Sequence, residues 1–567
     1  MVLAAFAVAS FCAFCGHVLA TETLIIPQGR IRGTVRQSRD SNPYYAFLGI
    51  PYALPPVEDL RFKDPVPHPG WSGERDATTD SPVCPQAMPY FPEKGDAIFG
   101  QEDCLFLNVY SPNPSSDAKL PVMVFVHGGG FLMGQATSNM YGPEYFMDHN
   151  VVLVTIQYRL GVLGFLSFGN AEVPGNLGMK DQVLALQWIQ ENIEEFGGNP
   201  DSVTIFGESA GAASVSYHLV SPLSKGLFHR AILQSGTASC SWASTPAWLA
   251  RDRAHAFATL VGCPTQPIET VLDCLRQLPT ETFVTTLNKF HIWFKNPMIT
   301  FAPVIESPLS QNNFLPDHPL RLPHADVPII IGVNNKEGGI VGAVYCTDDF
   351  KLTHQLNADF DRLLPLIVSC NWLPKDKRAE FVQKVKSFYL NNQPVGEDNL
   401  EGLIDLVSDL GFFQGAVDTA LHHSGYAPAF FYLYDYELPV SLNSMFGNCS
   451  QPLGVGHGDE LFQLFRMSVI SNYTHTPEEV TASNMLLRLW TSFARNGIPD
   501  HTAWGPVPSR AVTSREIEYL YVSRSSVSIH QGFVPERIEF ASALISEYMN
   551  YGSNDRRDES RSPKTEL

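Results

Sequence analysis

One serine of this 567-residue chain stands at an abrupt change in the local sequence pattern. The stretch VTIFGESAGAASVS (203–216) passes from four β-prone residues to two glycines that flank Ser209, and then to small residues that suit a helix. A serine hydroxyl is a weak nucleophile until a base removes its proton. Chemistry at Ser209 therefore requires partners from distant parts of the chain.

Two glycines explain how a strand and a helix can meet at this serine. In GESAG, a very tight strand-to-helix turn would bring Cβ atoms at positions 207 and 211 into collision, so glycine is expected at both. Such a turn holds Ser209 in a strained backbone conformation, with its hydroxyl projecting from the sheet edge. The motif also occurs by chance, but the strand before it and the helix after it favour a nucleophile.

The elements that must position Ser209 are a helix, a strand and the sheet around them. Apolar residues between 183 and 196 recur at steps of three and four, which predicts a helix that ends at Gly197. The residues NPDS (199–202) predict a turn, and 203–206 a strand. Continuous apolar runs predict further buried strands, which begin at Val122, Val151 and Val327. Such runs are typical of a sheet covered on both faces, so the sequence predicts a layered α/β fold.

The glycine-rich stretch HGGGF (127–131) follows the predicted strand at Val122. Backbone N–H groups in such a loop can approach a substrate oxygen closely, so Gly129, Gly130 and Ala210 are predicted to form an oxyanion hole. A plain turn and a phosphate-binding loop are the alternatives. The loop has neither a following Lys-Ser/Thr pair nor the glycine spacing of a dinucleotide-binding motif, which disfavours phosphate.

The composition is acidic and limits the possible partners. The chain has 58 Asp and Glu against 38 Lys and Arg, a formal net charge of -20. Such a protein repels phosphate backbones and anionic lipid, so we expect no nucleic-acid partner. After the first twenty residues, no stretch approaches the roughly 20 uninterrupted apolar residues of a transmembrane helix, and no membrane span is predicted.

The first twenty residues (1–20) predict a cleaved signal peptide. They carry no charged side chain, contain an apolar run and end in Val-Leu-Ala, although they lack a basic n-region. An apolar N-terminal strand is the alternative. No linker, repeat or charge block divides the remaining chain, so residues 21–550 are predicted to form a single domain and residues 551–567 a polar tail.

Several short features agree with the secretory pathway. Asn448 and Asn472 stand in the pattern of glycosylation acceptors. Of the ten cysteines, Cys12 and Cys15 lie in the predicted signal peptide, and the other eight are disulfide candidates in an oxidising compartment. The chain ends in Lys-Thr-Glu-Leu (564–567), one residue away from the Lys-Asp-Glu-Leu retrieval signal. Secretion and retention in the ER lumen therefore both stay open.

These motifs occur in order with others along nearly the whole mature sequence: FLGIPYALPP, EDCLFLNVYSP, VHGGGF, YRLGVLGFLS, GNLGMKDQVLALQWIQENIEEFGGNPDSVTIFGESAG, FHRAILQSG, GVNNKEGG and GVGHGDELF. With this set, the chain resembles the carboxylesterase/cholinesterase (type-B) family of α/β hydrolases. The stretches GQATSNMYGPEYF and QSGTASCSWA further resemble secreted arthropod carboxylesterases. The resemblance implies an α/β-hydrolase fold, with a large, mostly parallel, twisted central sheet and helices on both faces.

The resemblance also implies a catalytic triad. In that family the nucleophile comes first, the acid is a glutamate after a strand, and the base is a histidine in a later loop; here these are Ser209, Glu337 and His457. Glu337 follows the predicted strand at Val327, and His457 lies between two glycines in a loop free to place an imidazole, although a lone histidine is more often structural. The implied reaction is acyl transfer through a serine acyl-enzyme, and it needs no metal or other cofactor.

The family's disulfide pattern accounts for half of the eight cysteines. The resemblance pairs Cys84 with Cys104 and Cys263 with Cys274. It gives no partner to the remaining four, which are Cys240, Cys346, Cys370 and Cys449. No cysteine lies in the C-terminal tail, so a monomer or a non-covalent homo-oligomer is expected rather than a disulfide-linked one.

The pocket implied by the resemblance differs from that of a cholinesterase. Cholinesterases hold choline on a tryptophan between their first two paired cysteines, and the corresponding segment here, PQAMPYFPEKGDAIFGQED, has none. A cation could still use Tyr90 or Phe91. In NPMITFAPVIE (296–306), Pro297 and Ile299 replace aromatic acyl-pocket residues.

In the same stretch Phe301 remains aromatic, and Trp242 and Glu208 are also assigned to the substrate pocket. The pocket is therefore predicted to admit acyl groups larger than acetyl. Juvenile-hormone specialists typically carry glutamine where this chain has Glu208, which favours a general carboxylesterase for uncharged xenobiotic or lipid-like esters. A cholinesterase and a juvenile-hormone-type esterase are the alternatives. Neuroligin-like adhesion proteins share the fold but lack the nucleophile that this chain retains, so a binding-only role is disfavoured.

Overall fold

The computed structural model describes residues 21–87, 97–347, 350–447 and 449–549. The strands of its large sheet are β1 (Thr21–Ile26), β2 (Gly29–Gln37), β3 (Pro43–Pro51), β4 (Glu74–Asp76), β7 (Phe106–Ser111), β8 (Leu120–Val126), β9 (Val152–Ile156), β10 (Gly198–Glu208), β11 (Arg230–Gln234), β12 (Ile329–Asn334), β13 (Ala429–Asp435), β14 (Glu518–Ser523) and β15 (Val527–Gln531). Two short strands, β5 (Gln86–Ala87) and β6 (Ile98–Phe99), pair separately.

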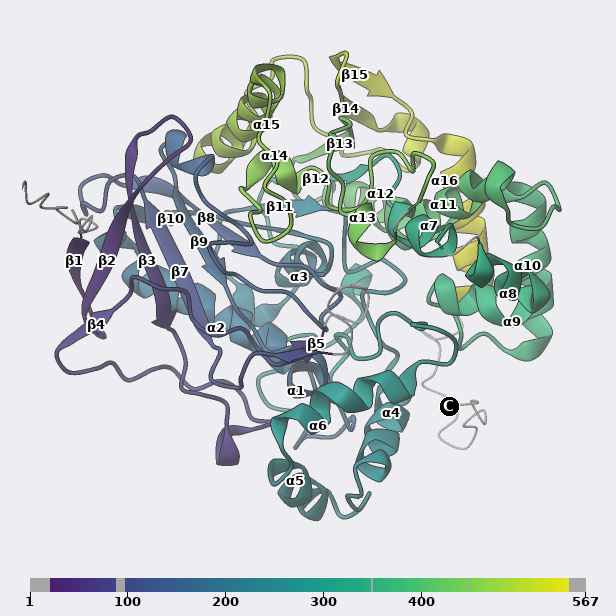
Figure 1. Cartoon of the computed structure of the whole chain (residues 1–567), viewed down its shortest axis with the longest axis horizontal. Helices are drawn as coiled ribbons and strands as arrows, with labels where there is room; N and C mark the ends of the chain where they lie inside the picture. The colour runs from purple at the N-terminus through teal and green to yellow at the C-terminus, as the bar shows by residue number, and fades with distance from the viewer. Residues whose placement is uncertain (1–20, 88–96, 348–349, 448, 550–567) are drawn as a thin grey trace, which may run out of the picture.

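The large sheet is parallel in its centre and antiparallel at its edges. Its strand order is β1-β2-β3-β7-β9-β8-β10-β11-β12-β13-β14-β15, with β4 paired to β2. All pairs from β9 through β14 are parallel. Figure 1 shows the sheet crossing the molecule, from β1 in purple at the left to β14 and β15 at the top. Parallel strands place their carboxyl ends at one edge, and this edge carries the candidate site.

Helices cover both faces of this sheet. They are α1 (Gly161–Phe165), α2 (Leu177–Asn192), α3 (Ala210–His218), α4 (Ala247–Leu260), α5 (Ile268–Arg276), α6 (Thr280–Thr285), α7 (Gly339–Tyr345), α8 (Lys351–Ala358), α9 (Phe360–Ile367), α10 (Lys375–Tyr389), α11 (Leu400–Ser408), α12 (Gln414–His423), α13 (Asn443–Phe446), α14 (Leu461–Leu464), α15 (Pro477–Asn496) and α16 (Pro535–Leu544). In Figure 1, α7 to α11 and α16 lie together at the right.

Strand β8 shows why the predicted strands read as continuous apolar runs. Val122, Val124 and Val126 belong to one hydrophobic core, which includes residues of α2 and α3. Met123 and Phe125, which alternate with them, belong to a second core that includes residues of α14 and α15. Because both faces of the strand are buried, no polar residue interrupts the run.

The segment that leads to the serine differs from the sequence prediction in one detail. The predicted helix is α2 with a following 3-10 turn, and Gly197 ends it with a φ of 83°. The NPDS residues (199–202) do not form a separate turn. They lie within β10, where the register with β8 shifts between Gly198 and Val203. Because Gly198 already pairs with Leu120, the four residues form an irregularity inside the strand rather than a turn before it.

The part of the chain that the structure describes contains three disulfides. Cys84 is joined to Cys104, and Cys263 to Cys274. A third bond joins Cys346 to Cys449, two residues to which the family resemblance assigned no partner. Cys240 and Cys370 are buried free thiols.

Several sequence predictions fall outside the described residues. Among these are the signal peptide (1–20), Asn448 and the C-terminal tail (551–567). The predicted boundaries of the single domain stay predictions. In the part of the chain that the structure describes, no helix has the length and apolar character that a membrane span requires.

Candidate active site

Ser209 occupies the point where β10 ends and α3 begins. Its φ is 59° and its ψ is -125°, a strained conformation for a residue with a side chain. A Cβ atom on Gly211 would lie 1.9 Å from the Val126 carbonyl oxygen, and one on Gly207 would lie 2.6 Å from the carbonyl carbon of Gly211. The backbone therefore admits only glycine on both sides of the serine.

His457 and Glu337 meet from opposite ends of a long chain segment. Glu337 follows β12, and its side chain is fully buried. Its Oε2 lies 2.6 Å from His457 Nδ1, while its Oε1 accepts a hydrogen bond from the Asn334 N–H at 2.7 Å. The carboxylate thus fixes the ring orientation of His457 and leaves Nε2 facing the cavity side of the site.

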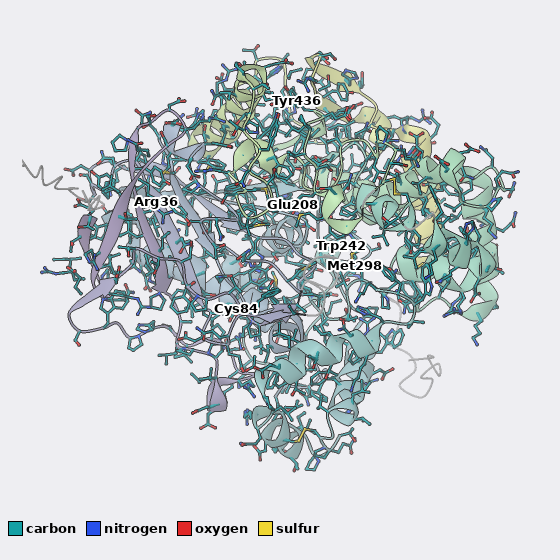
Figure 2. The ribbon with its side chains drawn as sticks, viewed as in Figure 1. Arg36, Cys84, Glu208, Trp242, Met298 and Tyr436 are labelled. Carbon is teal, nitrogen blue, oxygen red and sulfur yellow. A yellow bond between two sulfur atoms is a disulfide. The ribbon has the colours of Figure 1, made fainter. Side chains whose placement is uncertain are left out.

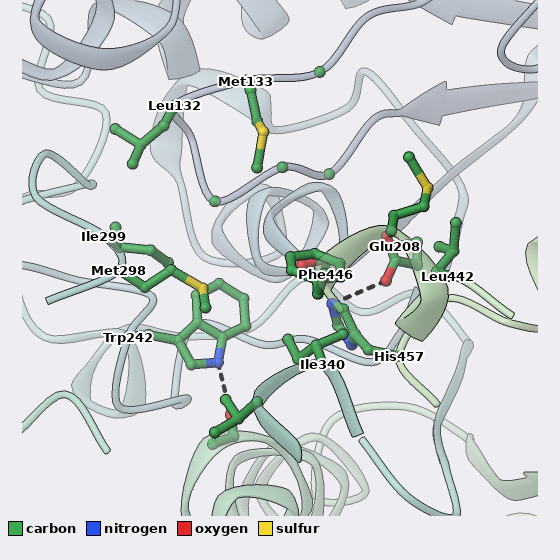
Figure 3. Close-up of a pocket in the computed structure, with 18 of the residues that line it drawn as sticks. Leu132, Met133, Glu208, Trp242, Met298, Ile299, Ile340, Leu442, Phe446 and His457 are labelled. Carbon is green, nitrogen blue, oxygen red and sulfur yellow. Dashed lines mark hydrogen bonds and ion pairs between the residues drawn. The ribbon is translucent and has the colours of Figure 1, made fainter. Parts of the chain in front are cut away.

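The other ring nitrogen of His457 faces a second carboxylate. Nε2 lies 3.0 Å from Oε1 of Glu208, the residue before the serine (Figure 3). No hydrogen bond joins Ser209 to His457 among the described residues, although both line the same cavity. The sequence predicted Glu208 as a pocket residue but gave no sign of this contact, since the approach depends on the loop that carries His457.

The imidazole between two carboxylates holds its proton tightly. Burial lowers the pKa of His457, but Glu208 and Glu337 outweigh burial and raise that pKa to about 9. Burial raises the pKa of Glu208 to about 8, against the opposing effect of His457. In this geometry the ring has to give up a proton before it can act as a base.

Two further buried carboxylates hold the histidine loop, and neither was among the predicted site residues. Glu460 accepts hydrogen bonds from the side-chain amides of Asn334 at 2.6 Å and Gln234 at 2.9 Å, and burial raises its pKa. Asp459 accepts from the N–H groups of Gly456 and Leu442, both at 2.8 Å, and burial raises its pKa to about 7.

The motif GHGDELF was the available sequence signal for both of these carboxylates. Within the described residues, no three His, Cys, Asp or Glu side chains are arranged to hold a metal ion.

The glycine-rich loop packs against the nucleophile. A Cβ on Gly128 would lie 2.9 Å from Ser209 Cβ, and one on Gly129, which has a φ of 104°, would lie 2.1 Å from the Met133 carbonyl oxygen. Gly129 and Gly130 line the cavity. The N–H of Ala210 is at the first position of α3, where a helix offers it no internal acceptor. Gly129 and Gly130 therefore line the same cavity as Ser209, and Ala210 follows the serine directly.

A buried histidine anchors the start of this loop. The ring of His127 stacks on Tyr158 with centroids 4.4 Å apart, and the Tyr158 hydroxyl donates to the His127 carbonyl at 2.8 Å. Burial lowers the pKa of His127 to about 4, so the ring is neutral at ordinary pH. The loop is thus held by packing and a neutral hydrogen bond rather than by charge.

A cavity of about 670 Å³ opens beside Ser209, and its wall is mainly apolar. Figure 3 shows Leu132, Met133, Trp242, Met298 and Ile299 on one side, with Ile340, Leu442 and Phe446 near His457. Among the described residues, Glu208 and His457 are the ionisable side chains of the wall besides one tyrosine, Tyr141. In Figure 2, Glu208, Trp242 and Met298 lie toward the middle of the molecule, whereas Arg36 and Tyr436 lie farther out.

The structure places two predicted pocket residues elsewhere. Trp242, Ile299 and Glu208 line the cavity, but Pro297 and Phe301 do not. Phe301 is 3% exposed and points into the core, with its ring 5.4 Å from Phe290. The family resemblance assigned Pro297, Ile299 and Phe301 to the pocket, whereas Met298 and Ile299 are the residues of this stretch that line the cavity. Tyr90 and Phe91, the possible cation contacts, lie outside the described residues.

The fold and the site together define a class of protein. A mostly parallel sheet with helices on both faces presents a serine at a strand-to-helix turn, a glutamate after the strand two places along, and a histidine in a later loop. This is the arrangement of an α/β hydrolase with a serine nucleophile.

Comparison with known proteins identifies the family. The profile of the Carboxylesterase family matches residues 20–541. The chain is 38% identical to venom carboxylesterase-6 of Apis mellifera over 506 residues, which cover 87% of this chain and 89% of that protein. It is 35% identical to juvenile hormone esterase of Tribolium castaneum over 508 residues, which cover 86% of each. The chain belongs to the carboxylesterase family.

A solved structure confirms the predicted fold. The crystal structure of juvenile hormone esterase from Manduca sexta, with OTFP covalently attached, superposes with a TM-score of 0.82 at 28% sequence identity. It covers 93% of this chain and 100% of that one. The predicted α/β-hydrolase fold is confirmed, and so is the prediction of a serine carboxylesterase that hydrolyses carboxylic esters.

Proposed function

We propose that Ser209, His457 and Glu337 carry out ester hydrolysis in two halves. His457 removes the Ser209 proton, and Ser209 attacks the ester carbonyl to form a tetrahedral intermediate. The N–H groups of Gly129, Gly130 and Ala210 bind its oxyanion. His457 then protonates the leaving alcohol, and water repeats the sequence on the acyl-enzyme. The 2.6 Å contact between Glu337 and His457, beside a cavity that Ser209 lines, carries this proposal.

The base step requires a change in the partner of His457. Nε2 is paired with Glu208 at 3.0 Å, so its proton has to pass to Glu208 or to solvent, and Nε2 has to come within hydrogen-bond distance of Ser209 Oγ before it accepts from the serine. Catalytic hydrogen bonds are often formed only when substrate is bound, so this geometry is compatible with the assignment. Glu208 thus becomes a group that sets the pH at which the base is available.

A variant of the nucleophile tests the assignment. Ser209→Ala should abolish ester hydrolysis while leaving the fold intact, because its hydroxyl faces the cavity and contributes little to the core. The measurement is the rate on p-nitrophenyl butyrate, with circular dichroism as the check on folding. A rate above about a thousandth of the wild-type value would remove Ser209 from the role of nucleophile. An unchanged rate would mean that a different residue of the chain is the nucleophile.

The substrates we propose are uncharged esters with acyl groups larger than acetyl. The wall is apolar beside Trp242 and Ile299, and the buried charge of Glu208 is already paired with His457. A series of p-nitrophenyl esters of rising acyl length, assayed beside acetylthiocholine, tests this class. A preference for acetylthiocholine over butyryl and uncharged aryl esters would replace the proposal with a cholinesterase.

A juvenile-hormone-type esterase is the second candidate. Two similar proteins are juvenile hormone esterases, and a cavity of about 670 Å³ with a mainly apolar wall suits a lipid-like methyl ester. The glutamate at position 208 is the observation against it. The test is the kcat/KM for a juvenile-hormone analogue relative to that for p-nitrophenyl butyrate. A large preference for the analogue would favour a juvenile-hormone-type esterase over a general carboxylesterase.

We also propose that the protein acts in the secretory pathway as a monomer or a non-covalent homo-oligomer. Three disulfides agree with an oxidising compartment, and Asn472, a predicted glycan acceptor, is exposed. Expression in insect cells should release the protein to the medium, and Asn472→Gln should remove one glycan. Retention that depends on the last four residues (564–567) would instead favour the ER lumen.

A further inference from the structure

A helical segment next to the cavity is interrupted by a turn of different geometry. α11 and α12 follow one another in the chain, and between them Asp409–Phe413 forms a π-helical turn whose five residues are all buried. We call this segment the π-turn. Such turns are rare and frequently occur at functional sites. Two of its residues, Gly411 and Phe412, line the cavity.

Two contacts join the π-turn to groups that face the substrate. The indole N–H of Trp242 donates to the Gly411 carbonyl oxygen at 2.8 Å, shown as a dashed line in Figure 3. The Phe412 ring lies 4.6 Å from the His457 ring and 5.8 Å from the Trp242 ring, measured between centroids. The π-turn therefore holds the indole of Trp242 through one contact and packs on the imidazole of His457 through the other.

The first residue of the π-turn is held from the C-terminal helix. Asp409 is fully buried, and Arg537 of α16 donates to it from Nε at 2.8 Å and from Nη2 at 2.6 Å. The Tyr389 hydroxyl donates to the same carboxylate at 2.8 Å. A two-point arginine–carboxylate contact sets both the distance and the orientation of the groups that it joins.

The same arginine reaches the loop of the predicted acid. Arg537 Nη1 lies 3.3 Å from Asp405 Oδ1, and Asp405 also pairs at 3.0 Å with Lys336, the residue before the acid. On the other side of the acid, the N–H of Gly338 donates to Ser408 Oγ at 2.9 Å. The segment that Arg537 holds thus contacts both neighbours of the acid.

We propose that Arg537 is a positioning residue for ester hydrolysis. Through Asp409 it holds the π-turn, and the π-turn orients Trp242 in the acyl wall and packs Phe412 on His457. The inference rests on the proposed function, because it assumes that esters react in this cavity. It predicts that loss of the Arg537–Asp409 contact changes the selection among acyl groups and does not merely lower the amount of folded protein.

The test replaces both charges together. Arg537→Met combined with Asp409→Asn leaves no unpaired buried charge, and the asparagine oxygen can still accept from Tyr389. Active sites are counted with diethyl p-nitrophenyl phosphate, which labels the serine and releases p-nitrophenol. The ratio of kcat/KM for p-nitrophenyl butyrate to that for the acetate is then measured per active site. Partial unfolding lowers both rates by the same factor, so this ratio reports the site alone.

We expect the ratio in the double variant to change about threefold or more, with a changed KM for butyrate. Trp242→Phe, which lacks the indole N–H, should change the ratio in the same direction. Arg537→Lys keeps the charge but not the two-point contact and should give an intermediate ratio; it also serves if the double variant does not fold. Arg515→Gln removes a half-exposed ion pair to Glu539 of α16, the helix that carries Arg537, and should leave the ratio unchanged.

A wild-type ratio and KM in the double variant or in Arg537→Lys, even with lower thermal stability, would overturn the inference. Failure of the proposed function would be seen differently, as an inability of the unmodified enzyme to hydrolyse either ester.

Discussion

The two sides of the candidate site are built in different ways. On the serine side, backbone approaches backbone so closely that side chains are excluded, as at Gly211. On the side of Glu337 and His457, the loop after β12, the segment from α11 to the π-turn, and the C-terminal helix α16 meet through side chains, as in the Arg537–Asp409 and Lys336–Asp405 pairs. On the serine side, the closely packed glycines can hardly be replaced by any other residue. The other side depends on contacts between residues that are far apart in the chain. The serine is therefore positioned by short-range sterics, and its partners by long-range contacts.

Substitution of the partners should produce the largest loss of activity. His457→Ala and Glu337→Gln should each lower kcat/KM by about 10⁴-fold, because one removes the base and the other leaves its ring without the contact that orients it. The double variant should be no more than about tenfold worse than the poorer single variant, since the groups act as one unit. Rates on p-nitrophenyl butyrate measure this. Losses that multiply in full would show that the two side chains are not coupled.

The serine side should fail through stability instead. Gly211→Ala places a methyl group 1.9 Å from the Val126 carbonyl oxygen and should lower the free energy of unfolding by about 3 kcal/mol or more. Gly396→Ala is the matched control, because a Cβ there meets nothing within 4 Å and its φ is -162°. Thermal denaturation of the two variants provides the comparison. Equal midpoints would mean that the turn can relax, and the contrast between the two sides would then disappear.

The carboxylate between the two sides should control the pH profile. Glu208 helps to raise the pKa of His457 to about 9, and the neutral imidazole is the form that acts as base. Glu208→Gln removes one of the charges that favour the protonated ring, so the acid limb of kcat/KM should move to lower pH by roughly one unit.

The charged groups near the ring that remain in this variant are Glu337 and Glu460. Profiles from pH 5 to 10 measure the shift. An acid limb that stays in place or moves upward would contradict the assignment of that pKa to the Glu208 contact.

The smallest effect concerns the acyl wall. If both additional methylenes are buried in the transition state, at about 0.8 kcal/mol each, butyrate should exceed acetate in kcat/KM by roughly tenfold. Ile299→Ala should shift the optimum toward longer acyl chains, because Ile299 lines the cavity. Phe301→Leu should lower stability and leave the optimum unchanged, because Phe301 is buried away from the cavity. If both variants shifted the optimum acyl length equally, Phe301 would have to line the pocket after all.

The sequence predicted the serine side in more detail than the other side. Gly207, Gly211 and the runs at Val122 and Val203 are local patterns with a steric cause, and the strands and the turn follow from them. Glu337 and His457 came from ordered family motifs, because spacing alone does not bring together two residues that are 120 positions apart.

The contacts of Glu208 with His457, of Arg537 with Asp409 and of Cys346 with Cys449 left no local signal. Pro297 and Phe301 were misplaced because the direction of a side chain in an irregular segment is set by its neighbours. Local steric constraints can thus be predicted from the sequence, whereas contacts between side chains far apart in the chain cannot.

The disulfide between Cys346 and Cys449 has a consequence for how the molecule responds to cleavage. It closes a stretch of chain with a sequence separation of 103, which contains α8 to α13 and the π-turn. A protease that cuts one surface loop within this stretch leaves two pieces of polypeptide that are still covalently connected on either side of the cut. The piece that carries His457 stays attached to the piece that carries Glu337 until a reducing agent reaches the bond, so a nicked enzyme runs as a single band without reductant and as two bands with it.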